Sequence, residues 1–445
     1  MIYDLVLHGG TLMTPGGEAR CDVAVRDGRI VDLGTFGPTK GERAIDCTGL
    51  HVLPGVIDTQ VHFREPGMEH KEDLQTGTAG AALGGVTGVF EMPNTNPSTT
   101  TQESIEDKLS RAEGRAWVEH AFYVGASAGN VDELARLERL PGVCGVKIFM
   151  GSSTGTLLVA DDEVLEAVLR AGTRRCAIHS EDDARLTERR GMTKGTGDPS
   201  LHPVWRDVET AVRSTKRLLR LARKTGRRVH VLHISTADEL PLLQANRDIA
   251  TVEFTPQHLT LSAPECYEQL GTLAQMNPPL RSAEHRAGLW EALRRGLADV
   301  IGSDHAPHTL EEKARPYPGS PSGMPGVQTL LPLMLDHVAE GRLTLRRLVE
   351  LTSAGPQRVF GLANKGRIAV GYDADFTLVD LKAKRTIERS WMATRSGWSP
   401  FEGRTVRGWP IATVVRGNVV MKDDELIGSP IGKPFQFVET LAPEG

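Results

Sequence analysis

The stretch GVIDTQVHFREPG, residues 55–67, constrains what this chain can fold into more than any other. Its apolar lead-in followed by alternating polar positions is typical of a buried strand that ends in polar side chains. On a regular strand, four of these side chains project to the same side, namely Asp58, Gln60, His62 and Arg64. Burying such a set is costly unless something binds it. The stretch therefore predicts either a self-satisfied polar patch or a binding site at a strand end.

Strand-like apolar runs recur eight times through the middle of the chain. They cover residues 55–63, 86–92, 119–125, 145–150, 176–180, 229–234, 250–256 and 299–303. Amphipathic segments lie between most of them, at 103–113, 131–140, 161–171, 208–225 and 284–296. Eight strand–helix repeats over roughly 300 residues are typical of a (β/α)8 TIM barrel. The alternative, an open doubly wound sheet, is disfavoured because no GxGxxG motif follows the first strand.

The two ends of the chain have a different sequence pattern, typical of a β-sheet domain. Short strand-like runs broken by glycine occupy residues 1–54, and the same pattern returns at 366–381 and 412–428. Neither piece is long enough to build a good core alone, so we expect one composite β-sandwich domain from 1–54 plus 365–445. The barrel would then span 55–364. The tail from about Lys433 is predicted to be a surface extension.

Charge and cysteine content exclude some classes of function. A formal net charge of −5 argues against a nucleic-acid binder, which normally carries a basic face. The five cysteines include no CxxC pair, which predicts reduced thiols in a cytoplasmic protein. No apolar stretch has the length of a membrane span, so we expect no membrane partner.

Chemically costly side chains follow the predicted barrel strands. They are His62, Arg64, Asn94, Lys147, His179, His233, Asp304 and His308. A single buried histidine is more often a hydrogen-bonded core residue than a ligand. Packing alone does not comfortably explain several such residues on separate strands, and TIM-barrel active sites lie at this end of the strands. His230 has the opposite strand parity to His233 and is predicted to be structural. His305 is predicted to point away from the pocket.

This set of side chains suits a divalent metal ion. Imidazole nitrogens and carboxylate oxygens are ligands that Zn²⁺ and similar ions accept. Lys147 is the exception, but within the apolar run GVKIFM desolvation favours its neutral amine. A neutral amine can take up CO₂ and become a carbamate, which is a bridging anionic ligand. The alternative is a lysine that reaches solvent from a strand end.

Seven motifs carry a resemblance to a known family: VIDTQVHFREPG, GGVTGVFEMPNTNP, GVKIFMGSSTG, AIHSED, HVLHIST, MNPPLR and GSDHAPHT. The chain resembles the amidohydrolase superfamily, and most closely the dihydroorotases of its cyclic-amidase branch, over essentially its whole length. The resemblance implies a (β/α)8 barrel with a flanking β-domain and a centre of one or two Zn²⁺ ions. It also implies reversible interconversion of dihydroorotate and N-carbamoyl-aspartate in pyrimidine biosynthesis.

The resemblance also assigns roles to residues. It implies carboxylated Lys147 as a bridging ligand, His179 and His233 as ligands of the second ion, and His62 and Asp304 as ligands of the first. Asp304 is further implied as the general acid/base. Arg64, Asn94 and His308 would hold the substrate carboxylate, since a guanidinium can grip a carboxylate bidentately. Asn277 and the backbone at Ser322 and Gly323 would contact the ring.

One position departs from the family pattern. The first strand of the family reads HxH, and here the first histidine is replaced by Gln60. A neutral amide oxygen is a weaker Zn²⁺ ligand than imidazole, so either His62, the Lys147 carbamate and Asp304 hold the first ion with water, or that position is largely empty. The second possibility defines an alternative function, a catalytically silent partner of aspartate transcarbamoylase.

Two further alternatives concern substrate and assembly. Hydantoinase- and allantoinase-type cyclic amidases share the metal motifs, but their substrates lack the carboxylate that Arg64 would bind. For the active enzyme the partner is a small-molecule substrate, and we expect a homodimer or higher homo-oligomer.

Overall fold

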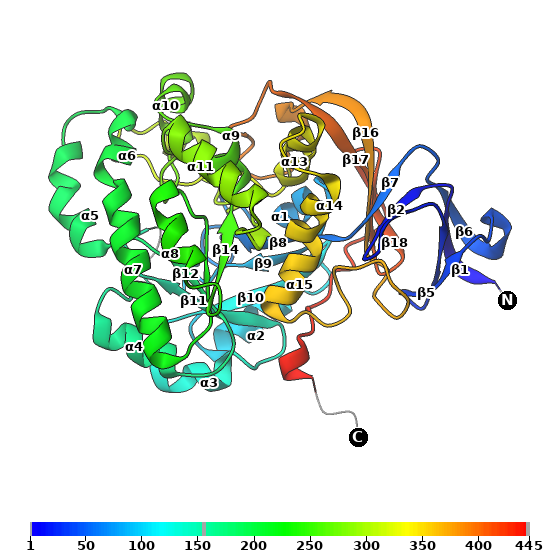
Figure 1. Cartoon of the computed structure of the whole chain (residues 1–445), viewed down its shortest axis with the longest axis horizontal. Helices are drawn as coiled ribbons and strands as arrows, with labels where there is room; N and C mark the ends of the chain where they lie inside the picture. The colour runs from blue at the N-terminus through cyan, green and yellow to red at the C-terminus, as the bar shows by residue number, and fades with distance from the viewer. Residues whose placement is uncertain (1, 154–156, 442–445) are drawn as a thin grey trace.

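The computed structural model describes residues 2–153 and 157–441. Its centre is an eight-stranded parallel sheet whose strands follow one another in chain order (Figure 1). The strands are β8 (Val56–Val61), β9 (Val86–Glu91), β10 (Glu119–Gly125), β11 (Val143–Phe149), β12 (Cys176–His179), β13 (Val229–Val231), β14 (Ala250–Phe254) and β15 (Val300–Ile301). A parallel bridge between Val61 and His305 closes the first strand onto the end of the last. The predicted TIM barrel is confirmed.

Helices surround this sheet. They are α1 (Leu74–Leu83), α2 (Gln102–Ala112), α3 (Leu134–Leu137), α4 (Asp162–Arg170), α5 (Asp183–Arg189), α6 (His202–Trp205), α7 (Val208–Thr225), α8 (Leu240–Gln244), α9 (Pro256–Thr260), α10 (Glu265–Leu270), α11 (Ala283–Arg294), α12 (Leu310–Lys313), α13 (Leu330–Ala339), α14 (Leu345–Val349) and α15 (Gly355–Phe360). The longest of them, α7, shows how the sequence sets the two ends of a helix. Asp207 caps its first turn through the Thr210 amide, and Gly226 ends it in a left-handed conformation.

Two further sheets lie beside the barrel, at the right of Figure 1. One contains β5 (Arg29–Gly34), β4 (Asp22–Arg26), β1 (Tyr3–His8) and β6 (Gly41–Asp46). The other joins β19 (Glu425–Leu426), β18 (Asn418–Lys422), β17 (Thr405–Val415) and β16 (Phe376–Thr386) to β7 (His51–Pro54), β2 (Thr11–Thr14) and β3 (Gly17–Ala19). Leu5, Val52, Phe376 and Val414 share one buried cluster. Both chain ends thus build the predicted β-sandwich, while the exact domain boundaries stay a prediction.

The C-terminal tail differs from the expectation. Phe435 and Phe437 are 3% and 1% exposed, and both rings pack edge-on against Phe90 of β9. Their neighbour Pro434 bridges to His120 of β10. The tail is therefore part of the core under the barrel, because its two aromatic rings bury a large apolar area there.

A buried ion-pair cluster connects the barrel to the sheets beside it. The Lys365 ammonium lies 2.7 Å from Glu119 on β10, 2.9 Å from Asp373 and 2.7 Å from Asp375. Arg416 adds a contact of 3.0 Å to Glu119. Two cations thus face three carboxylates, and each buried charge has a partner.

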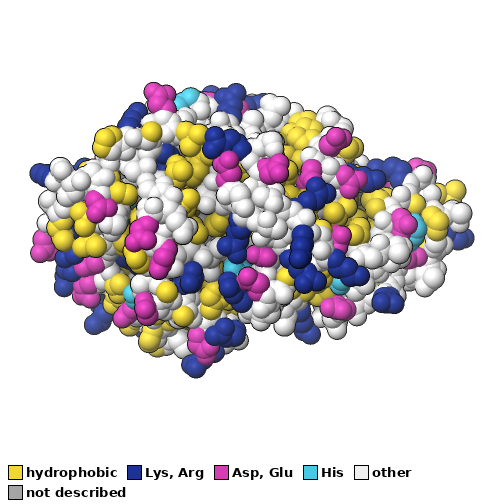
Figure 2. Space-filling view, turned by 90° about the horizontal axis from the view of Figure 1, so that it is seen from above, with side chains coloured by type: hydrophobic (Ala, Val, Ile, Leu, Met, Phe, Trp, Pro, Cys, Tyr) yellow, Lys and Arg dark blue, Asp and Glu magenta, His cyan; other side chains and the backbone are white. Residues whose placement is uncertain are grey.

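The surface carries charges of both signs. On the face seen in Figure 2, basic and acidic side chains are intermingled. Within residues 2–153 and 157–441, no helix combines the length and apolarity that crossing a membrane requires.

Candidate active site

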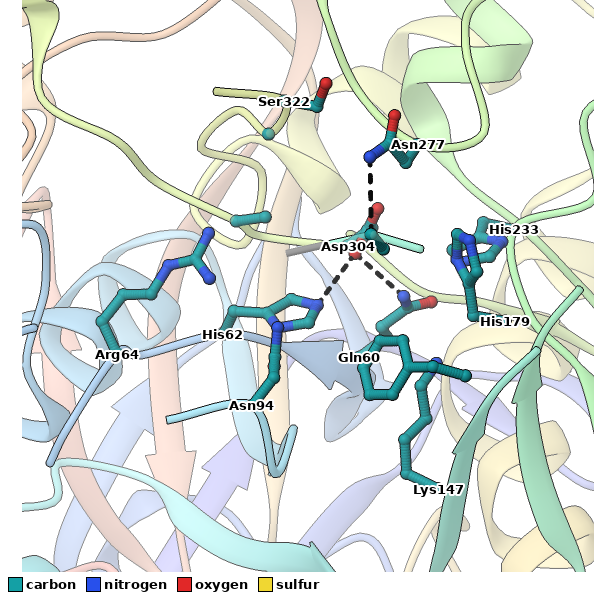
Figure 3. A pocket seen from close by; sticks show the side chains of 14 residues that line it. Gln60, His62, Arg64, Asn94, Lys147, His179, His233, Asn277, Asp304 and Ser322 are labelled. Atoms are coloured by element: carbon teal, nitrogen blue, oxygen red, sulfur yellow. Dashed lines mark hydrogen bonds and ion pairs between the residues drawn. The ribbon is translucent and has the colours of Figure 1, made fainter. Parts of the chain in front are cut away.

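A cavity lies at the C-terminal ends of the barrel strands, where the sequence predicted the site (Figure 3). Its lining includes eleven of the twelve predicted metal, substrate and catalytic residues, and nine of them are Gln60, His62, Arg64, Asn94, Lys147, His179, His233, Asn277 and Asp304. Ser322 and Gly323 lie on the opposite wall, and Phe149, Ser153 and Ala306 complete the lining. His308 is the predicted site residue that lies behind this lining.

His179 and His233 present nitrogen atoms to each other. Nδ1 of His179 lies 3.1 Å from Nε2 of His233, while Nε2 of His179 lies 2.9 Å from the Glu181 carboxylate. If His179 donates its one proton to Glu181, its Nδ1 lone pair faces His233. Burial lowers the pKa of both histidines, that of His233 well below its ordinary value. Both rings are therefore neutral at pH 7, with nitrogen lone pairs available in the cavity.

Asp304 forms a second cluster of donors with His62 and Gln60. Its Oδ1 accepts a hydrogen bond of 2.8 Å from Nε2 of Gln60 and lies 3.2 Å from Nε2 of His62. Nδ1 of His62 lies 2.7 Å from Oδ1 of Asn94, so Asn94 accepts its proton and directs the Nε2 lone pair toward Asp304. Two electron-rich atoms at this distance require a proton or a cation beside them. Oε1 of Gln60 is buried with no hydrogen-bond partner among the described residues.

Lys147 reaches the cavity from β11 below these two pairs, as Figure 3 shows. The residue is 1% exposed, and burial lowers its pKa to about 7. Its Nζ lies 4.6 Å from the centre of the Phe149 ring and makes no ion pair with another described residue. The predicted loss of charge by desolvation is thus consistent with the structure. The alternative of a lysine that reaches solvent is wrong.

Arg64 lies on the other side of His62 from the histidine pair (Figure 3). It is 1% exposed, its Nε donates to the Pro307 carbonyl at 3.2 Å, and its Nη2 lies 3.3 Å from Nε2 of His308. Nη1 has no hydrogen-bond partner among the described residues. Arg64 forms no ion pair there with Asp58 or Glu65; Glu65 instead pairs with Arg115. A buried guanidinium facing a cavity without a carboxylate partner favours an anionic ligand.

A roomier pocket adjoins the cavity. It encloses about 360 Å³ and shares Ser153, Asn277 and Ser322 with the inner cavity, whose own free space is about 20 Å³. The inner part thus has room for about one water molecule or an ion, and the outer part has room for a small ring.

Three site residues have backbone conformations in the left-handed region. The φ angles are 64° for Arg64, 38° for His233 and 46° for Asp304. Such conformations cost about 1–3 kcal/mol each in residues other than glycine, and they concentrate at functional sites. The end of β8 therefore departs from regular alternation before Arg64. Asp58, which the parity argument placed beside Gln60, His62 and Arg64, lies deeper in the barrel and accepts from the Ser303 amide.

The donor set fits a divalent cation. Two nitrogen ligands of one tetrahedral Zn²⁺ ion lie about 3.3 Å apart, given bonds of 2.0–2.1 Å. The separation of 3.1 Å between His179 and His233 is close to this value. Among the described residues, His179 and His233 on one side and His62 and Asp304 on the other meet only as pairs. Glu119, Asp373 and Asp375 form the one described group of three or more His, Cys, Asp or Glu residues whose ligand atoms all lie within 4.8 Å of one another. Lys365 already occupies the centre of this group, so it is an ion-pair network.

Sequence reasoning missed the groups behind the site. Glu181 holds His179, and Arg206 in turn holds Glu181 at 3.1 Å. Burial disfavours the charge on Glu181, but Arg206 and His179 outweigh this effect and keep its pKa below its ordinary value. The position of Glu181, two residues after His179 in the motif AIHSED, was the available signal. His305 points away from the cavity as predicted, toward Glu72 at 3.2 Å.

The fold is a TIM barrel whose cavity brings imidazole, amine, guanidinium and carboxylate groups together at the C-terminal ends of the strands. Comparison with protein families matches residues 51–420 to the amidohydrolase family, and the chain belongs to that family. It is 35% identical to a dihydroorotase of Methanosarcina mazei over 92% of each chain. It is also 34% identical to an allantoinase of Deinococcus radiodurans, over 97% of this chain and 98% of that one.

Solved structures agree with these relatives. The L-hydantoinase (dihydropyrimidinase) from Arthrobacter aurescens superposes with a TM-score of 0.93 and 30% identity, covering 98% of this chain and all of that one. The predicted family and the prediction that the chain is an enzyme of that family are both confirmed.

Proposed function

We propose that this protein hydrolyses a cyclic amide that carries a carboxylate, with dihydroorotate and N-carbamoyl-aspartate as the interconverting pair. The observation that carries the proposal is the Arg64 guanidinium, which is buried at the cavity wall with Nη1 unpartnered among the described residues. The relatives named dihydroorotase support this choice of ring. Formation of dihydroorotate would place the reaction in pyrimidine biosynthesis.

The metal centre is part of the proposal. His179, His233 and the carbamate of Lys147 would hold one Zn²⁺ ion, and His62, Asp304 and the Lys147 carbamate would hold another. Gln60 offers only a neutral oxygen to this second position, and its amide nitrogen already donates to Asp304. A divalent ion bound here would activate water and polarise the ring carbonyl as a Lewis acid.

The protein's own groups would then guide the hydrolysis. Water adds to the ring carbonyl carbon, and the carbon–nitrogen bond of the ring breaks. Asp304 accepts the proton that water loses and returns it to the departing nitrogen. Asn94 keeps the Nε2 lone pair of His62 directed at the centre through its contact of 2.7 Å with Nδ1.

The substrate contacts follow from the cavity walls. Arg64 would bind the carboxylate of the substrate through its open Nη1. His308, expected to touch the carboxylate, instead contacts Nη2 of Arg64 at 3.3 Å and would act by bracing the guanidinium. Asn277, Ser322 and Gly323 would face the ring from the opposite wall.

Gln60 supports a second candidate function, a silent homologue that serves as a structural partner of aspartate transcarbamoylase. An amide that replaces a histidine ligand weakens one metal position. Hydantoinase- or allantoinase-type activity is the third candidate, because such proteins are among the relatives.

One experiment separates the three candidates. Metal content is measured by elemental analysis, and ring opening is followed with dihydroorotate, hydantoin and allantoin. Turnover of dihydroorotate with at least one ion per chain supports the proposal. Turnover of the carboxylate-free rings alone supports the third candidate, and a folded, metal-free, inactive protein supports the silent partner. Size-exclusion chromatography would test the proposed homo-oligomer in the same preparation.

A further inference from the structure

Lys313, the last residue of α12, is a buried lysine surrounded by carbonyl groups, and burial lowers its pKa from an ordinary 10.5 to about 7. It is 0% exposed, and its ammonium donates to the carbonyls of Gln275 at 3.3 Å, Pro321 at 2.9 Å and Gly323 at 3.1 Å. The Trp398 ring covers it, with the ring centre 5.9 Å from Nζ. Among the described residues it makes no ion pair with a carboxylate. When the amine is protonated, each of its three N–H groups has a backbone oxygen partner.

These carbonyls belong to the two segments that form the outer wall of the active-site cavity. Gln275 precedes Asn277 by two residues, and Pro321 and Gly323 flank Ser322. The Gly323 amide also donates to the Gln275 carbonyl at 2.8 Å, so the segments contact each other directly under the ammonium. Asn277, Ser322 and Gly323 all line the cavity.

The wall has little freedom to shift toward the metal ligands. A Cβ atom added to Gly323 would lie 2.3 Å from the Ala306 carbonyl oxygen, two residues after Asp304. Gly323 also has a φ of 138°, which other residues rarely adopt. Gly323 therefore packs closely against Ala306, after the last barrel strand, on one side. On the other side, its carbonyl accepts a hydrogen bond from Lys313.

Burying a lysine is costly unless its charge is compensated. An apolar side chain of the same length would fill the same space without this cost, so packing alone does not explain a lysine here. What the ammonium adds is a three-way link between segments that are about 45 residues apart in the chain.

We propose that Lys313 is a positioning residue that fixes Asn277 and Ser322 against the substrate ring. The inference rests on the proposed ring-opening function for its kinetic consequence. Lys313 touches neither the substrate nor the metal ligands, so its loss should weaken ring binding in the ground state and the transition state alike. Uniform loss of binding raises KM and leaves kcat nearly unchanged.

The test compares Lys313→Met with Thr272→Val. Methionine has a similar length without the charge. Thr272 donates to the Lys313 backbone carbonyl at 2.5 Å, so its valine variant perturbs the same helix but leaves the ammonium in place. For Lys313→Met we expect KM to rise about tenfold, with kcat within about threefold and metal content unchanged. For Thr272→Val we expect KM within about twofold of the wild type. Equal KM changes in both variants, or none in Lys313→Met, would overturn the proposal.

Chemical rescue adds a readout that a purely structural role would not move. In Lys313→Ala, ethylammonium should restore KM because it supplies N–H donors to the three carbonyls, whereas ethanol at the same concentration should not. Equal rescue by the two compounds would count against an electrostatic link.

Hydrogen exchange provides a measurement that does not depend on activity. The Gly323 amide should exchange faster in Lys313→Met than in the wild type and Thr272→Val, because the link that holds its carbonyl partner is gone. Unchanged exchange would refute the positioning role. If the Gly323 amide exchanges faster in Lys313→Met but the wild-type protein does not open dihydroorotate, the positioning role of Lys313 would be supported and the proposed function would be refuted.

Discussion

Replacing Arg64 with methionine tests the proposed substrate class most directly. Methionine keeps much of the apolar length and removes the charge. Of the five N–H donors of Arg64, the one on Nε is used on Pro307, and Nη2 lies beside His308. The donors on Nη1 have no partner among the described residues and remain for a ligand.

Arg64→Met should lower kcat/KM and at the same time raise the free energy of unfolding. Losing one partner of a buried charge pair costs about 3–5 kcal/mol, so kcat/KM for dihydroorotate should fall roughly 100- to 5,000-fold. Burial lowers the pKa of Arg64 from 12.5 to about 10. Below pH 10 the charged form is thus disfavoured in the fold relative to the unfolded chain, and removing it should stabilise the free protein by up to about 3 kcal/mol.

The assay pairs dihydroorotate with hydantoin, a ring without the carboxylate. Ring opening is followed for both substrates, and denaturant unfolding is measured on the free protein. The reasoning requires a large loss on dihydroorotate, a change below about threefold on hydantoin, and a gain in stability. An equal loss on both rings would show that Arg64 organises the site in general, and the carboxylate argument would be refuted.

Four further changes have defined outcomes. Glu181→Gln should lower metal affinity about 10- to 100-fold in a chelator competition, because Glu181 orients His179. Gln60→His should raise the metal content measured by elemental analysis toward two ions per chain, since imidazole is the stronger Zn²⁺ ligand. Phe435→Ala should destabilise the fold by about 3–5 kcal/mol in denaturant unfolding, because the ring is buried against Phe90. Burial lowers the pKa of His120 to about 4 from an ordinary 6.5, so stability should fall as the pH drops from about 6.5 to 4, and His120→Phe should flatten this dependence in thermal unfolding.

The sequence was sufficient for the barrel and for most of the site's lining. An apolar strand that ends in polar residues can be recognised locally in the sequence. In a barrel the C-terminal ends of all strands lie at the same face, so these polar residues lie close together. This is why the sequence alone indicates that His62, Lys147, His179, His233 and Asp304 lie together. The roles assigned to these residues stay predictions.

What the sequence did not reveal depends on contacts between distant segments. The tail looked like a surface extension because Phe435 and Phe437 are separated by nearly 350 residues from Phe90, the ring they cover. The contact of His308 with Arg64 joins residues that are 244 positions apart, and no sequence pattern indicates the left-handed backbone conformation of Arg64. Lys313 gives no signal in the sequence, because its partners are backbone carbonyls and carry no side-chain pattern.

The three left-handed residues of the site have a consequence for heat inactivation. Arg64, His233 and Asp304 hold their conformations only while the surrounding barrel ends enforce them. A small loosening at these ends would let each backbone relax to a more common conformation, well before the hydrophobic core opens. On heating, turnover should therefore disappear some degrees below the melting transition of the fold, and return on cooling.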